Sequence, residues 1–387
     1  MSMTHDFSLT SDQEMIRESA AQFLSERSSS NAVRAAMETV EGFDPSLWTA
    51  VGTELGWTAT HTPEEYGGLG LSFIELTLLL EQMGRRLLCS PFFATVALGA
   101  TALMEAASED GKNRYLPDIA SGELTATVGF GSRGVDWDPR AVSAVAKPID
   151  QGYTLTGTFR HVPDGATATL LLLVAKLDGK SALFAVPSNT HGLEIREHEN
   201  LDRTRRIAEL RLEGVVVDRA SILSEGSDLD DAMSRVRALA GIALAAEQLG
   251  GAQQCLDMTL AYAAERVQFG RTINSFQAVK HRCAEMMVKI EATRSAVFGA
   301  ARAAVASPST EELLLEAACA KTFASETFYF CAQEAIQLHG GVGFTWEYDP
   351  HLYFKRAQAS SQWFGSPGAL REEVAASLLD TKSVAAI

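Results

Sequence analysis

Several patterns that identify common classes of protein are missing from this sequence. Its five cysteines are dispersed without a C-x-x-C pair, and its eight histidines show no metal-ligand spacing, which argues against a disulfide framework and a zinc site. No signal-peptide pattern opens the chain, and no apolar run reaches the ~18 residues of a membrane span. The sequence therefore predicts a cytoplasmic protein with reduced thiols, no bound metal and no membrane association.

Basic residues are also scarce, with 33 lysines and arginines against 49 aspartates and glutamates and a net charge of −16. An acidic surface repels nucleic acids and anionic lipids, so neither is expected as a partner. A few well-placed arginines would still suffice to hold a phosphorylated small molecule. The 387 residues, of which 46% are hydrophobic, allow two or three domains with sizeable cores.

The spacing of apolar residues changes twice along the chain. Residues 1–125 have helical spacing, and Thr10 or Ser11 can cap the first helix. Residues 126–228 contain short β-type runs divided by Gly-, Asp- and Asn-bearing turns, which favours a small barrel or sandwich. Residues 229–387 return to long, alanine-rich helical segments. We predict an α+β protein with an N-terminal α-helical domain, a middle β-barrel domain and a C-terminal four-helix bundle.

The individual elements are predicted from the same spacing. Ser309 or Thr310 is the natural cap of one late helix, and Gly250 and Gly251 would allow close packing of another. After a first helix that begins near residue 10, helices are expected over residues 43–55, 72–88, 94–107, 233–259, 276–306, 311–338 and 369–379. Strands are expected over residues 125–130, 141–146, 153–157, 168–175, 181–186, 207–212 and 215–217.

The stretch R-V-Q-F-G-R-T-I-N-S-F-Q-A-V-K-H at residues 266–281 separates two of these long helices. Arg266, Gln268, Asn274 and Gln277 bring polar donors into a short break that contains glycine. Exposed backbone N–H groups and a guanidinium suit a phosphate or diphosphate. A polar loop that only joins two bundle helices explains the spacing equally well.

The order of residues in this stretch resembles the R-x-Q-F-G-x-x-I-x-x-F-Q-x-x-x-H signature of the acyl-CoA dehydrogenase family. A second match is Q-L-H-G-G-V-G-F-T-W at residues 337–346, followed by H-L-Y-F-K-R at residues 351–356. The resemblance implies a flavoprotein that binds FAD, oxidises an acyl-CoA thioester to its α,β-enoyl form and passes electrons to an electron-transferring flavoprotein.

This reaction needs a carboxylate in a dry cleft to remove the α-proton, and the family pattern places that base at one of two points. The sequence departs from the pattern at both. Phe364 takes the position of the carboxylate in the loop before the last helix, and Ala240 takes it on the first long helix of the C-terminal bundle. Gly241 stands where many relatives carry an arginine that contacts CoA, and Arg237 is a possible substitute.

Glu247 lies on the same apolar helix, two turns beyond Ala240. It is either a displaced catalytic base or a structural carboxylate paired with an arginine, and we favour the structural interpretation.

The resemblance divides the expected flavin contacts into two groups. The residues that a family subunit gives to its neighbour's FAD are retained, namely Arg266, Gln268, Phe269, Gln277, Gln337, Gly340 and Gly341. The loop with which a subunit holds its own flavin reads G-S-R-G-V-D-W-D at residues 131–138, and only Gly134 and Asp138 follow the pattern. A Trp-Ile-Thr element that the family places beside the flavin ring reads H-V-P at residues 161–163.

These departures predict a component of an FAD-dependent acyl-CoA dehydrogenase that lends flavin-binding residues to a partner carrying the base. The complex would be an α2β2 tetramer acting on a fatty or bulky, steroid-derived acyl-CoA. Two alternatives stay open. One is a self-sufficient homotetramer whose base is Glu247 or another carboxylate, and the other is a structural or regulatory paralogue without catalysis.

Overall fold

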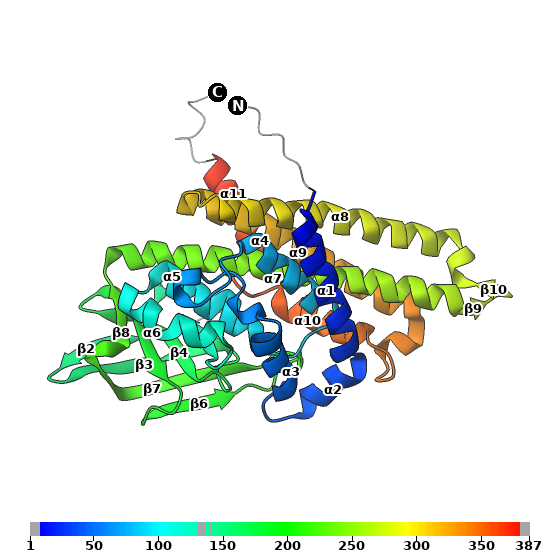
Figure 1. The fold of residues 1–387 in the computed structure, drawn as a ribbon. Coiled ribbons are helices and arrows are strands. Elements are labelled where there is room, and N and C mark those ends of the chain that lie inside the picture. Colours follow the sequence, from blue (N-terminus) through cyan, green and yellow to red (C-terminus); the bar gives the residue numbers. More distant parts are fainter. Residues whose placement is uncertain (1–7, 131–136, 139–140, 380–387) are drawn as a thin grey trace.

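The computed structural model describes residues 8–130, 137–138 and 141–379. N-terminal helices and a β-sheet lie along one side of a bundle of long C-terminal helices (Figure 1). One continuous cluster of buried apolar residues runs through all three parts. The predicted order of helices, strands and helices is confirmed. No helix in the described ranges is long and apolar enough to cross a membrane.

The N-terminal part contains six α-helices in the described residues. They are α1 (Ser11–Arg27), α2 (Ser30–Glu38), α3 (Pro45–Thr49), α4 (Phe73–Arg85), α5 (Thr101–Ala106) and α6 (Glu109–Ala120). Thr10 caps α1 as predicted, because its side chain accepts a hydrogen bond from the backbone N–H of Gln13 while the Gln13 side chain accepts from the backbone N–H of Thr10. The helix expected over 94–107 begins as a π-helical segment, η4 (Phe93–Ala100).

The middle part, where it is described, is one mixed sheet of eight strands. They are β1 (Ala126–Phe130), β2 (Val145–Ile149), β3 (Gly152–Pro163), β4 (Leu170–Leu177), β5 (Lys180–Pro187), β6 (Leu193–Glu197), β7 (Ile207–Asp218) and β8 (Ile222–Glu225). The pairing runs in the order β6-β7-β3-β2-β4-β5-β8, and β1 pairs with β4. The pairs of β4 with β1 and β2 are parallel, and the others are antiparallel.

The C-terminal part is built on three long helices, α7 (Ser227–Glu265), α8 (Gln277–Val305) and α9 (Thr310–His339). A two-stranded hairpin of β9 (Val267–Gln268) and β10 (Arg271–Thr272) joins α7 to α8. Two shorter helices follow, α10 (Pro350–Ser360) and α11 (Pro367–Leu379). Ser309 caps α9 as predicted, with Glu312 completing a capping box.

Close approach of α4 and α7 joins the N-terminal helices to the bundle. A Cβ built on Gly250 of α7 would lie 1.8 Å from the carbonyl oxygen of Glu81, and one built on Gly84 of α4 would lie 1.9 Å from that of Glu247. Only glycine allows the two backbones to meet at this distance. The close packing that we expected at Gly250 and Gly251 is therefore present, because Gly251 likewise lies against the Phe328 ring.

Candidate functional site

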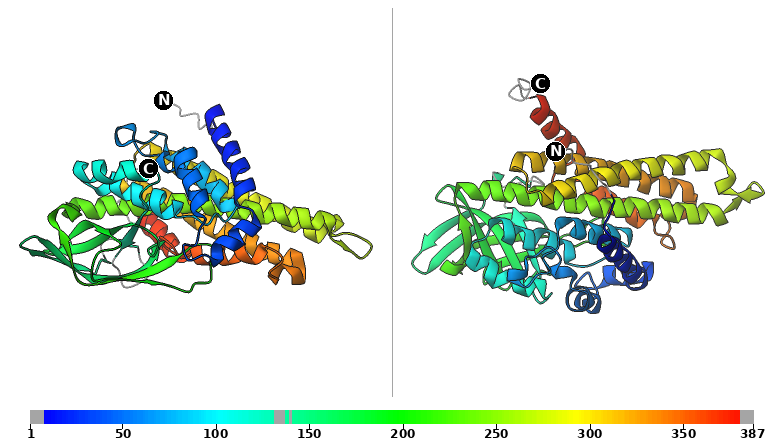
Figure 2. Two further views of the ribbon diagram at one scale, coloured as in Figure 1. Left: turned by 60° about the horizontal axis from the view of Figure 1, so that its bottom comes forward. Right: turned by 45° about the horizontal axis from the view of Figure 1, so that its top comes forward.

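The predicted cofactor residues meet at one end of the bundle, the end that carries the β9–β10 hairpin. The helices α7 and α9 both finish there, and the Tyr262 and His339 rings stack at a centroid distance of 4.3 Å to hold the two ends together. The hairpin projects beyond the bundle, at the opposite end from the sheet (Figures 1 and 2). We call this end, residues 266–282 with 337–341, the hairpin end.

The seven predicted residues at the hairpin end are all exposed: Arg266, Gln268, Phe269, Gln277, Gln337, Gly340 and Gly341. A Cβ on Gly340 or Gly341 would meet no atom within 4 Å. Within the described part of the chain, no carboxylate pairs with Arg266. The backbone and the guanidinium are therefore open to a ligand that is held partly by another molecule.

The hairpin turn itself is strained in an exposed position. Phe269 and Gly270 have φ angles of 55° and 78°, as a two-residue turn of type I′ requires at both central positions. A phenylalanine in this left-handed region is unusual, and its side chain is 91% exposed. Its ring has an edge-to-face contact with Phe276 at a centroid distance of 6.1 Å, and the rest of its surface is open to another molecule.

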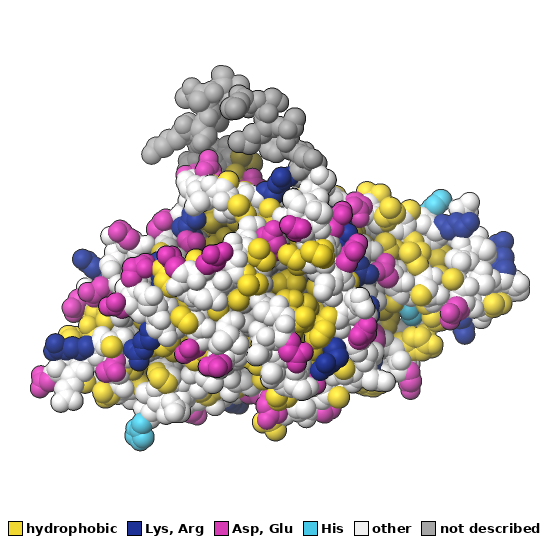
Figure 3. Space-filling view, viewed as in Figure 1, with side chains coloured by type: hydrophobic (Ala, Val, Ile, Leu, Met, Phe, Trp, Pro, Cys, Tyr) yellow, Lys and Arg dark blue, Asp and Glu magenta, His cyan; other side chains and the backbone are white. Residues whose placement is uncertain are grey.

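The hairpin end is basic although the protein as a whole is acidic. Arg266, Arg271, Lys280 and Arg282 all lie within residues 266–282, and Lys and Arg side chains gather at this end of the surface (Figure 3). Arg271 packs over the Phe276 ring at 4.2 Å, which fixes the hairpin to the start of α8. Positive charge beside open glycine backbone fits the diphosphate of a dinucleotide such as FAD.

The two positions expected to carry a base lie far from the hairpin end. Arg237 lies near the start of α7, so it is separated from Arg266 by roughly 40 Å of helix at 1.5 Å per residue. Ala240, one turn further along α7, is fully buried, and Phe364 is 2% exposed in the connection between α10 and α11. Phe364 has a φ of 58°, and Gly365 one of 117°. The expected base position on α7 and the hairpin end therefore lie roughly 40 Å apart along this helix.

Four buried aromatic side chains meet around Phe364. The rings of Trp137 and Phe364 lie 4.6 Å apart, and those of Phe93 and Trp363 lie 6.1 Å apart. Phe93 also lies 6.2 Å from Phe364, and Trp137 lies 6.3 Å from Trp363. We call Phe93, Trp137, Trp363 and Phe364 the aromatic closure, because their rings fill the space beside the expected base position.

Part of the flavin loop predicted from the resemblance lies outside the described residues, including Gly134. Its last two residues are described: Trp137 belongs to the aromatic closure, and Asp138 lines a cleft of about 770 Å³ beside it. His161, at the place of the expected tryptophan, has a φ of 55° and lies 5.9 Å from the ring of His198.

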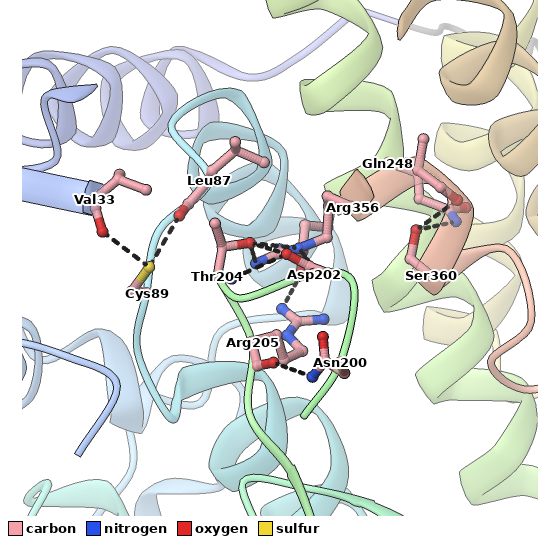
Figure 4. Close-up of polar contacts among 12 residues, drawn as sticks. Val33, Leu87, Cys89, Asn200, Asp202, Thr204, Arg205, Gln248, Arg356 and Ser360 are labelled. Atoms are coloured by element: carbon pink, nitrogen blue, oxygen red, sulfur yellow. Dashed lines mark hydrogen bonds and ion pairs between the residues drawn. The ribbon is translucent and has the colours of Figure 1, made fainter. Parts of the chain in front are cut away.

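Glu247 is buried between two arginines. Its carboxylate pairs with Arg205 at 2.6 Å and with Arg356, and Arg356 also pairs with Asp202 at 2.6 Å. Figure 4 shows Asp202, Thr204 and Arg205, from the loop before β7, facing Arg356 of α10. Burial acts to raise the pKa of Glu247, but the two guanidiniums outweigh it, and the pKa lies below its ordinary value.

One buried polar group near the closure was not singled out from the sequence. Lys321 of α9 is 1% exposed, and its Nζ donates to Ser325 Oγ at 2.7 Å and to the Ser361 carbonyl at 3.4 Å. Ser325 Oγ donates to Gln248 Oε1 at 3.1 Å, and Gln248 Nε2 donates to Ser360 Oγ at 2.9 Å. Burial lowers the pKa of Lys321 to about 7. The sequence signal that could have identified Lys321 is a lysine within an alanine-rich helical segment.

A helical domain, a central sheet and a long-helix bundle with a diphosphate-compatible end define the class of flavin-dependent dehydrogenases. The family models for the N-terminal and C-terminal domains of acyl-CoA dehydrogenases match residues 10–123 and 232–379. The chain is 35% identical over 356 residues to acyl-CoA dehydrogenase IpdE2 of Mycobacterium tuberculosis, covering 92% of this chain and 94% of that one. It therefore belongs to the acyl-CoA dehydrogenase family, whose cofactor is FAD.

Two solved structures give the same fold. The ChsE4–ChsE5 complex from Mycobacterium tuberculosis contains a chain that is 25% identical, with a TM-score of 0.87, covering 97% of this chain and 99% of that one. A variant of the Tcur3481–Tcur3483 steroid ACAD contains a chain that is 29% identical, with a TM-score of 0.85, covering 96% of this chain and 99% of that one.

Proposed function

We propose that this chain is one component of a heteromeric, FAD-dependent acyl-CoA dehydrogenase and that it completes the flavin site of a catalytic partner. The observation that carries the proposal is the separation of two sites along α7. The retained flavin residues are exposed at the hairpin end, roughly 40 Å along the helix from the cleft of the same chain. A chain arranged in this way has to meet another molecule before its flavin residues can act.

The residues of the hairpin end would hold the FAD of the partner. Arg266 suits a diphosphate oxygen because a guanidinium can donate two parallel hydrogen bonds to an anion. Gly340 and Gly341 leave room for a phosphate or ribose to approach the backbone. Gln268, Gln277 and Gln337 add amide donors and acceptors around it. FAD, when bound, supplies the acceptor for the hydride of the acyl β-carbon.

The base for the α-proton would come from the partner. Phe364 and Ala240 cannot accept a proton, and the aromatic closure occupies the space beside Phe364. Glu247 is already saturated by Arg205 and Arg356, and its pKa is lowered. A general base working near neutral pH needs a raised pKa and a free oxygen, so the geometry of Glu247 supports a structural role.

The substrate class rests on the relatives. The similar solved structures include a two-protein complex and an acyl-CoA dehydrogenase described as a steroid ACAD. Their likeness to this chain supports an α2β2 assembly and a bulky, steroid-derived acyl-CoA thioester as substrate. We expect an electron-transferring flavoprotein as electron acceptor and a cytoplasmic location.

The first test is the flavin-to-chain ratio and native mass of the chain alone and after co-expression with its genomic neighbours. We expect a colourless or unstable chain alone and about one flavin per pair in the complex. Arg266→Gln should remove flavin from the complex, whereas the matched control Arg211→Gln on the exposed face of β7 should not. A yellow homotetramer with one flavin per chain would refute the proposal and would favour a self-sufficient enzyme.

A further inference from the structure

The loop at residues 200–206, before β7, connects the sheet to the N-terminal helices, and we call it the arginine strap. Arg206 Nη2 donates to the carbonyl oxygens of Met37 and Thr39, at 3.3 and 2.5 Å. Its Nε has no hydrogen-bond partner among the described residues, but it lies against Gly42, where a Cβ would approach it to 2.5 Å. Arg206 is therefore directed to the N-terminal part of the protein.

Four buried charged side chains at the strap balance one another. Arg205 pairs with Glu247 of α7 at 2.6 Å, and Asp202 pairs with Arg356 of α10 at 2.6 Å. None of the four residues is more than 8% exposed. Two guanidiniums and two carboxylates leave this cluster without net charge, which is the arrangement that a buried site tolerates.

A further carboxyl group, that of Asp164, disturbs this balance when it is ionised. Asp164 follows β3 and is 6% exposed, and its backbone N–H donates to the Arg206 carbonyl at 3.0 Å. Its Oδ2 is buried without a hydrogen-bond partner among the described residues. The charged and titratable groups around it are Arg205, Arg206, Arg356, Glu247 and the Cys89 thiol, with Asp202 paired to Arg356. Burial raises the pKa of Asp164 to about 7, against the opposing guanidiniums.

The guanidinium of Arg205 has an unused donor and also contacts the aromatic closure. Its Nη2 donates to Glu247, whereas Nη1 is buried without a hydrogen-bond partner among the described residues. The guanidinium lies over the Phe93 ring at 4.6 Å and over the Trp363 ring at 5.2 Å. Arg205 therefore connects the charged cluster to the closure.

We propose that Asp164 is a proton-operated switch for the aromatic closure. With the carboxyl protonated, the cluster is neutral and Arg205 stays between Glu247 and the two aromatic rings. Loss of the proton leaves an uncompensated negative charge in a buried place, and the unused Nη1 of Arg205 is the donor that can compensate it. Arg205 then turns toward Asp164, and its contact with Trp363 is lost. This switch is a property of the chain itself and does not rest on the proposed function.

The test is the tryptophan emission of the full chain between about pH 5.5 and about pH 8.5. Wild-type emission should change with the binding of one proton and a midpoint near pH 7, because a guanidinium that leaves the face of an indole alters its surroundings. Asp164→Asn cannot ionise and should keep the low-pH emission throughout. Trp363→Phe should remove the change. If the chain has to be purified with a partner, the partner contributes equally to wild type and variant.

The matched control is Asp178→Asn. Asp178 has a φ of 49°, against 50° for Asp164, and each aspartate precedes a glycine. Asp178 is exposed, so its amide variant should keep the wild-type change in emission.

A second measurement needs no variant. Infrared spectra of the wild type should contain the C=O band of a protonated carboxyl group at about pH 6, and the band should disappear by about pH 8.5. Wild-type emission that does not change with pH, a change that persists in Asp164→Asn or Trp363→Phe, or a wild type without this band would overturn the inference.

Discussion

Replacing Glu247 by glutamine separates a structural carboxylate from a catalytic one. The substitution keeps the shape of the side chain but removes the negative charge between Arg205, at 2.6 Å, and Arg356. Breaking a buried ion pair costs about 3–5 kcal/mol, because the other charge stays buried without compensation. Asp202 still pairs with Arg356 at 2.6 Å, so the charge left without a partner is mainly that of Arg205. We therefore expect about 3 kcal/mol, the low end of that range.

The pH dependence of the unfolding free energy gives a second test of the charge on Glu247. Because the pKa of Glu247 is lowered in the folded state, its contribution is present above the ordinary carboxyl pKa and is lost as pH falls through the folded value. Wild-type stability should therefore fall below about pH 4.5 partly through this group. The Glu247→Gln variant should start less stable at neutral pH and should lose less on acidification.

The assay combines denaturant unfolding at several pH values with dehydrogenation by the flavin-loaded complex. The structural interpretation predicts a large loss of unfolding free energy and an unchanged rate per assembled complex. Glu373→Gln is the control, since it breaks an exposed pair with Arg237 and should cost only ~0–1 kcal/mol. An unchanged stability together with a rate loss of a hundredfold or more would refute the reasoning and make Glu247 the base.

Three further predictions follow from buried or capping groups. The pKa of Lys321 is lowered from 10.5 to about 7 in the folded chain. Between these pH values the unfolded chain binds more protons, so the unfolding free energy of the wild type should rise by up to ~1.4 kcal/mol per pH unit. Denaturant titration from about pH 7 to about pH 9.5 should show that Lys321→Met flattens this slope. Gly250→Ala places a Cβ 1.8 Å from the Glu81 carbonyl and should yield little folded protein on size-exclusion chromatography, whereas Gly299→Ala, with open space around it, should stabilise by about 0.5–1 kcal/mol. Ser309→Ala removes the cap of α9 and should lower the unfolding free energy in denaturant titration by about 0.5–2 kcal/mol, and a cost near zero would contradict the capping role.

Local chemistry explains which elements could be predicted from the sequence. The capping boxes at Thr10 and Ser309 are complete within four residues, so both helix starts were predicted and confirmed. The strand β7 was expected as two runs because Gly214 interrupts its pattern. In the structure the strand continues, since residues 213–214 bulge opposite Thr156, where Gly214 has a φ of 66°. Pairing with β3 decides whether the strand continues past Gly214, and the residues next to this glycine do not reveal that pairing.

The short elements β6, β8 and α2 were missed for a related reason. All three are short, and the two strands are held by their neighbours, β6 by pairing with β7 and β8 by pairing with β5. Tertiary contacts override weak local preference in elements of this length.

The partners of Glu247 could not be predicted from the sequence either. Arg205 and Arg356 lie 42 and 109 residues away in sequence, and no local spacing identifies them among the other arginines.

The topology of the bundle brings the two flavin motifs together, although the sequence places them far apart. Because α8 runs back along α7 and α9 returns, the ends of α7 and α9 meet at the hairpin end, where Tyr262 stacks on His339. The individual residues could be predicted from the motifs. Their exposure and their distance from the chain's own cleft required the structure.

These features also bear on the homotetramer alternative. In an assembly of identical chains, the hairpin end of one copy could complete the flavin site only of another copy of the same cleft. That cleft would again hold Phe364 and the aromatic closure, with Arg237 paired to Glu373. Gly340, Gly341 and Arg266 would then hold FAD next to a cleft without a base. Under the proposed function, we therefore expect the hairpin end to be productive only when the neighbouring cleft belongs to a different chain, one that has a carboxylate at the position of Phe364 or Ala240.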